Sequence, residues 1–156
     1  MLTNFSLPPA TTVIAGPWIV TDPYYDLGSF DPLTGVFTVS TTGYYSFKVT
    51  INYNTSAAIT ASLAGGVDPG FVLRRTSAPV TDLIAGNIPL LNVNVALVLT
   101  LRTILGNGLV VLAGDLHLIA GDLISLIYVA DGLTIPLTLG GQNPPGIVYS
   151  CFLLSL

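Results

Sequence analysis

The most constraining feature of the sequence is an alternation that runs through GVFTVSTTGYYSFKVTINY. Phe37 and Val39 precede Gly43, and every odd position from Tyr45 to Tyr53 after it is apolar or aromatic. A strand sends successive side chains to opposite faces, so this pattern predicts two strands that contribute to one buried layer. We expect Gly43 at a bend or a close backbone approach, where a Cβ would clash.

Short segments bounded by Gly, Asp, Asn or Pro follow along the rest of the chain. They predict strands near 13–20, 35–40, 43–54, 57–64, 109–118, 123–130, 133–139 and 147–154, with another in FVLRRTS. The strongest alternation, from 88 to 105, predicts a strand that is covered on both faces in its middle. No amphipathic helix of useful length is visible. Roughly nine or ten short strands in one domain predict an all-β sandwich or jelly roll.

The length of 156 residues suits one domain with a full core. We expect residues 1–12 to be a loose lead-in and residues 13–156 to be a single jelly-roll domain. Charged residues make up 8% of the chain, and soluble domains usually have about 25%. Because hydrophobic residues reach 51%, a lone monomer could hardly cover its surface with charge, and we expect part of that surface to be buried in an oligomer.

The charge balance and the hydrophobic pattern exclude several classes of function. The chain has four basic residues against eight aspartates and no glutamate, so a nucleic-acid surface is not expected. No uninterrupted apolar stretch reaches about 18 residues, so we expect no membrane helix. The first residues lack the basic start and apolar run of a signal peptide, so we expect another export route or a trimmed precursor.

Few residues could carry chemistry. His117 is the only histidine and is expected on one face of a strand, and Cys151, the only cysteine, is expected as a buried, inert thiol. We therefore expect no enzyme and no cofactor. A calcium site formed by Asp22, Asp26 and Asp31 is an alternative, although their spacing is not that of an EF-hand.

The tetrapeptide AGDL occurs at 113–116 and again at 120–123. A repeat of this length is too short to be a solenoid unit. We interpret both copies as turns, in which Asp115 and Asp122 bond to nearby backbone groups.

The alternating segment resembles the signature of the globular head of complement component 1q, which shares a fold with tumour necrosis factor. The residues that carry the resemblance, all expected in the core, are Phe37, Gly43, Tyr45 and Phe47, with Phe30 upstream, Gly121 and Asp122 in LHLIAGDLISL, and Phe152 and Leu154 in the closing YSCFLL. It spans roughly residues 13–156. Val49, Tyr25 and Cys151 depart from the family pattern. The low charge and missing glutamate look most like the heads of bacterial collagen-like proteins on Bacillus-type spore surfaces.

The resemblance implies a ten-stranded jelly roll that assembles as a homotrimer and has no catalytic residues. The interface candidates that it suggests, on strands near the threefold axis, are Tyr44, Tyr53, His117, Tyr149 and Cys151. The implied partners are other copies of the chain, and candidate further partners are other surface-layer proteins or a host receptor or glycan. Neither nucleic-acid binding nor membrane insertion is expected. The implied location is extracellular, or on a spore or cell surface.

We therefore expect a non-enzymatic trimeric head that serves structural trimerisation and surface display on the exterior of a bacterial spore or cell. One alternative is a secreted ligand or recognition module that binds a receptor or glycan through loops such as 65–70, 106–108 and 140–146. A second alternative is a viral spike or capsid jelly roll. Strands that are apolar on both faces look alike, so the sequence leaves open which faces form the core and which form an interface.

Overall fold

The computed structural model describes residues 1–55, 63, 65–96, 99–140 and 145–156. This part of the chain contains thirteen strands and no helix, which confirms the all-β class. It accordingly holds no helix that is long and apolar enough to cross a membrane. The strand expected near 57–64, apart from Leu63, and residues 141–144 of the loop expected at 140–146 lie outside the described residues.

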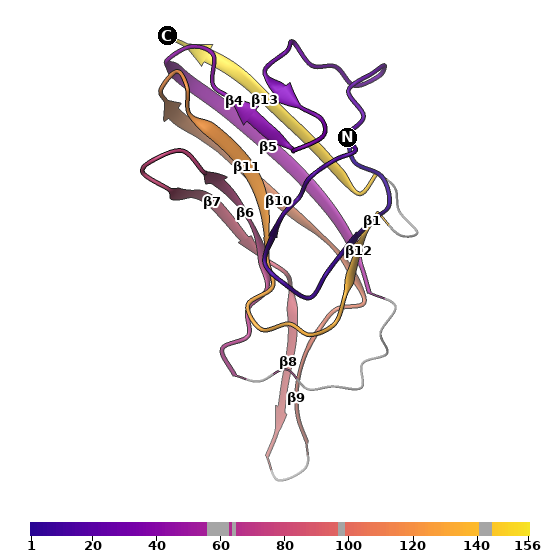
Figure 1. Ribbon diagram of the computed structural model, residues 1–156. Helices are drawn as coiled ribbons and strands as arrows, with labels where there is room; N and C mark the ends of the chain where they lie inside the picture. Colours follow the sequence, from indigo (N-terminus) through magenta and orange to yellow (C-terminus); the bar gives the residue numbers. More distant parts are fainter. Residues whose placement is uncertain (56–62, 64, 97–98, 141–144) are drawn as a thin grey trace.

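Two antiparallel sheets pack face to face as a sandwich (Figure 1). The β5 sheet contains β1 (Phe5–Leu7), β12 (Leu137–Leu139), β5 (Gly43–Asn54) and β10 (Asn107–Leu118) in that order, with β13 (Ile147–Ser155) also paired to β5. The β11 sheet contains β3 (Phe30–Asp31), β4 (Val36–Thr38), β11 (Leu123–Val129), β6 (Gly70–Arg75) and β7 (Thr81–Asn87), with β2 (Thr12–Val13) also paired to β11. The remaining pair, β8 (Leu90–Val95) and β9 (Leu99–Ile104), projects from one end of the sandwich (Figure 1).

The core lies between the β5 and β11 sheets. All odd positions of β5 from Tyr45 to Tyr53 are buried, as the alternation predicted. The ring of Phe37 on β4 lies 6.0 Å from those of Tyr45 and Phe47, in edge-to-face contact in each case. These aromatic contacts join the two sheets across the predicted buried layer.

Gly43 lies where the backbone of another strand comes close. A Cβ at this position would clash with the carbonyl oxygen of Ser155 and lie 2.9 Å from Leu153 Cδ1. The close approach expected from the sequence is therefore confirmed, and the neighbour is the end of β13, which pairs with β5 along most of its length.

The stretch from 88 to 105 does not form a single strand. It folds back on itself as the β8–β9 hairpin, in register from Leu90 opposite Ile104 to Val95 opposite Leu99. The prediction was wrong because the reversal contains no glycine or proline to mark it. The hairpin is attached to the sandwich at its base, where Arg102 donates to the carbonyl of Val67 and to the carboxylate of Asp68, both at 2.6 Å.

Three other expectations need correction. The first AGDL copy is not a turn, because Asp115 lies in the middle of β10, whereas the second copy is a turn with Gly121 at a φ of +93°. Residues 1–12, expected as a loose lead-in, instead supply β1 and the buried side chains of Leu2 and Leu7. The count of ten strands is not matched, since several pieces of two or three residues pair separately.

We predict that Gly35→Ala lowers the free energy of unfolding by roughly 2–4 kcal/mol. Gly35 has a φ of +71°, and a Cβ there would clash with the carbonyl oxygen of Ile14 and come within 3.0 Å of Trp18 Nε1. Urea denaturation at one fixed protein concentration measures the change. Gly106→Ala is the matched control, because no atom lies near its Cβ position and its φ is not positive, and its effect should stay below about 0.5 kcal/mol. Equal effects of both variants would contradict the prediction.

Candidate functional site

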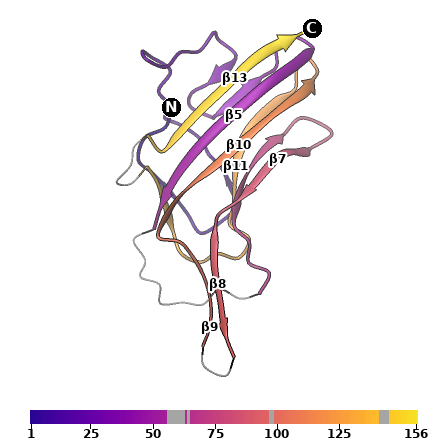
Figure 2. The same ribbon diagram turned by 180° about the vertical axis from the view of Figure 1, so that it is seen from behind.

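One face of the β5 sheet is turned away from the β11 sheet, and we call it the open face (Figure 2). The register of β5 with β10 and β13 assigns to it the even residues of β5, the odd residues of β10 and the even residues of β13 up to Phe152. It carries several exposed apolar side chains: Tyr44, Leu109, Val111 and Phe152. Leu109 is 54% exposed and Val111 is 50% exposed, so β10, at the edge of the sheet, presents two large aliphatic side chains to the outside.

The structure divides the five interface candidates between the two faces of the β5 sheet. Tyr44 and His117 are opposite each other on the open face, with ring centroids 5.1 Å apart. Tyr53 faces the core and is only 2% exposed. Tyr149 and Cys151 pair with core-facing Val49 and Phe47, so they also face inward.

The C-terminal strand therefore has the opposite orientation to the one expected. Phe152 and Leu154, which the resemblance placed in the core, are both more than half exposed, and Phe152 lies on the open face opposite Ser46. Both faces of YSCFLL are apolar, so the sequence offered no sign of which alternate residues point inward. A shift of one residue moves every side chain of a strand to the other face.

The other signature residues lie in the core or beside it. Phe37, Tyr45 and Phe47 are buried, and Phe30 packs against the core at 5.4 Å from Trp18. Asp122 is buried and accepts hydrogen bonds from Ser77 Oγ at 3.1 Å and from the backbone N–H of Ile119 at 3.0 Å. Arg75 Nη1 lies 3.7 Å from the same carboxylate. Asp122 thus fixes the turn before β11, with each of its carboxylate oxygens accepting a hydrogen bond.

The three loop aspartates are not arranged as a metal site. Asp26 accepts hydrogen bonds from the backbone N–H groups of Gly28 and Phe30, and Asp31 accepts them from the backbone of Leu33 and from the hydroxyl of Thr34. The bonds to Thr34 and Leu33 lower the pKa of Asp31. Within the described residues, no group of three or more His, Cys, Asp or Glu side chains is placed to hold a metal ion.

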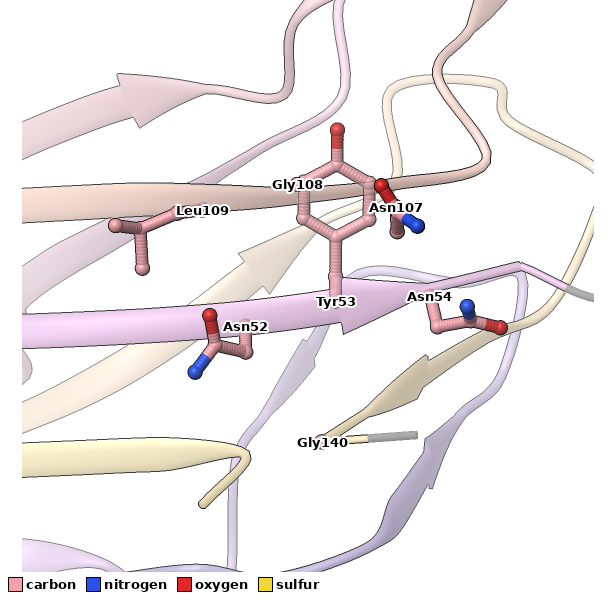
Figure 3. Close-up of a pocket in the computed structure, with 7 residues that line it drawn as sticks. All are labelled: Asn52, Tyr53, Asn54, Asn107, Gly108, Leu109 and Gly140. Carbon is pink, nitrogen blue, oxygen red and sulfur yellow. The ribbon is translucent and has the colours of Figure 1, made fainter. Parts of the chain in front are cut away.

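A pocket of about 240 Å³ lies at one end of the open face (Figure 3). Asn52, Asn54 and Asn107 bring their amide groups to it from β5 and β10, and the ring of Tyr53 lies beside Gly108. Asn52 donates to the carbonyl of Pro145 at 2.9 Å and thereby holds the start of β13 against β5. The sequence did not predict this pocket, because its lining residues are ordinary strand residues that are brought together only by the register between β5 and β10.

An apolar groove of about 470 Å³ runs between the segment around Trp18 to Phe30 and β13. The rings of Trp18, Phe30 and Tyr149 contact one another there at centroid distances of 5.4 to 6.2 Å. The Tyr149 hydroxyl is buried with no hydrogen-bond partner among the described residues, and this burial raises the pKa of Tyr149 well above its ordinary value. Burial also raises the pKa of the Cys151 thiol to about 12.

His117 and Cys151 do not form a catalytic pair. His117 lies on the open face, where it contacts Tyr44, whereas Cys151 faces the core on the other side of the same sheet. A nucleophile and a general base have to be within hydrogen-bond reach of each other. Cys151 and His117 are therefore not placed to act together.

We predict that Cys151 reacts with a disulfide reagent at pH 8 at least about 100-fold more slowly in the folded protein than in urea. The thiolate is the reactive form, and raising the pKa from 9.0 to about 12 lowers its population at pH 8 by about 1,000-fold. The same shift means that the unfolded chain ionises first, so the folded state should lose stability as the pH rises from about 9 towards 12. Equal reaction rates with and without urea would contradict the burial of the thiol.

Comparison with known proteins gives similarities to a viral protein and to solved structures. No family model matches the chain. An uncharacterized protein of Acanthamoeba polyphaga mimivirus is 25% identical over 138 residues, which cover 81% of this chain and 51% of that protein. The chain thus spans about half the length of that relative. Among solved structures, the globular domain of zebrafish complement 1qA protein is similar over 97% of each chain, with 20% sequence identity and a TM-score of 0.45.

Proposed function

We propose that the chain is a non-enzymatic head that assembles as a homotrimer through the open face of its β5 sheet. The observation that carries the proposal is the set of exposed apolar side chains on that face, among them Leu109, Val111 and Phe152. Burial of apolar surface between copies stabilises an assembly, and a closed symmetric oligomer gives such a face a partner of matching composition. The number of three subunits rests on the resemblance of the alternating segment to complement component 1q heads.

The low charge of the chain supports the same proposal. Only 8% of the residues are charged, and the open face carries few of them. A surface with so little charge promotes association. In this function the domain nucleates trimers and presents its outer loops, and we place it outside a cell, on the exterior of a bacterial spore or cell.

A second candidate is the same kind of head on a virus particle. The observation behind this candidate is the similarity to a mimivirus protein over 81% of the chain. The two candidates share the self-associating face and differ in what the head is attached to.

A recognition role is the third candidate, and the amide-lined pocket supports it. Asn54 and Asn107 offer both donors and acceptors, which suit the hydroxyl groups of a glycan. A glycan array probed with the assembled protein separates this role from a purely structural one. Binding that is lost in Asn107→Ala would favour recognition, and an array without any signal would favour the structural role.

We predict that the protein has three times its chain mass of 16.3 kDa in solution and that Val111→Asp shifts it to the monomer. Burying an unpaired carboxylate between copies is costly, whereas the same residue at an exposed strand position of a monomer changes stability little. Sedimentation equilibrium over a range of concentrations measures both masses.

Val80→Asp is the matched control for this experiment. Val80 is 65% exposed in the turn between β6 and β7, away from the β5 sheet, so this variant should remain trimeric. A wild-type protein that stays monomeric at every concentration would overturn the proposal, and so would equal masses of the two variants.

A further inference from the structure

One basic side chain has no carboxylate partner. Each arginine lies within ion-pair distance of an aspartate, and the pairs are Arg74 with Asp82, Arg75 with Asp122 and Arg102 with Asp68. Lys48, the only lysine, forms no ion pair with any described residue, and every charged side chain of the sequence belongs to the described part. The cation of Lys48 is therefore left exposed on the open face, near the middle of β5.

The open face also carries one acidic side chain, Asp115 on β10. Lys48 is opposite Ala113, and Asp115 is opposite Ser46, so the two charged residues are diagonal neighbours on adjacent strands. Diagonal neighbours lie roughly 7–8 Å apart at Cα, yet the two side chains form no ion pair with each other. The face thus presents one positive and one negative charge among uncharged side chains, both without a partner in the described part of the chain.

We infer that Lys48 of one copy pairs with Asp115 of a neighbouring copy and that this pair fixes the alignment of the copies. The inference rests on the proposed function, because it assumes that open faces meet. An ammonium group that is buried without a counter-ion is strongly destabilising, so an interface over Lys48 has to supply a carboxylate. Asp115 is the carboxylate that the same face of a second copy offers.

The geometry allows this pairing. Within one copy the two residues are offset by two positions along the strands, about 6.8 Å of rise, so a shift of about this size between neighbouring copies brings Lys48 of one copy opposite Asp115 of the next. Copies that meet in another alignment would place like charges together or leave both charges unpaired. The apolar side chains of the open face are non-directional in their attraction, so the charge pair is what distinguishes one alignment from the others.

The test is charge reversal combined with mixing. Lys48→Asp gives the open face two negative charges, and Asp115→Lys gives it two positive charges. We expect each single variant to associate at least tenfold more weakly than the wild type in sedimentation equilibrium, and the double variant K48D/D115K to return to within about threefold of it. Mixing the two single variants should raise the associated fraction above that of either alone, because opposite charges then meet between copies.

The mixing step separates pairing between copies from pairing within one chain, since an internal pair cannot be restored by a second protein. Asp22→Lys makes the same charge change as Asp115→Lys, but on an exposed loop residue. This variant should associate as the wild type does. Circular dichroism melts show whether each variant is folded. Single variants that associate normally, or a mixture without gain, would overturn the charge pair while the proposed trimer stands. A wild type that never associates would instead overturn the proposed function on which the pair rests.

Discussion

The pairing of β5 on both of its edges is the constraint on which the rest of the molecule depends. β10 pairs with it along all twelve residues from Gly43 to Asn54, and β13 and β12 occupy the opposite edge. Once that register is set, each paired residue of these strands faces either the core or the outside, except at the irregularity between Leu153 and Ser155. The close approach at Gly43 is one consequence of this register, and the positions of Lys48 and Asp115 on the open face are another.

The sequence predicted the strands in which the side-chain alternation and the turn residues at the ends agree. β5 has the predicted bounds, and β10, β11 and β13 differ from prediction by one or two residues, because glycine, proline or aspartate marks their ends. The β8–β9 hairpin was missed because both of its strands continue the same apolar alternation through an unmarked turn. The two AGDL copies show the same limit, since one is a turn and the other lies within β10, where pairing with β5 overrides the turn preference of the tetrapeptide.

The candidate site was predicted only in part, for a reason that lies in the faces of the strands. Tyr44 and His117, expected at a trimer interface, lie opposite each other on the open face, in strands whose side chains alternate clearly. Tyr149 and Phe152 were exchanged between core and open face because β13 is apolar at both odd and even positions. The amide pocket and the two unpaired charges depend on cross-strand register, which a single sequence does not contain.

Three tyrosine hydroxyls are buried without a hydrogen-bond partner among the described residues: Tyr53, Tyr128 and Tyr149. Each such group costs about 1–3 kcal/mol relative to a hydrated hydroxyl, which is a considerable fraction of the stability of a domain of this size. A sandwich with these unpaired hydroxyls in its core has a smaller free energy of unfolding as a single chain. In the proposed trimer, the persistence of the fold is then tied to mass action, so that the folded population of each subunit depends on how many other subunits are present.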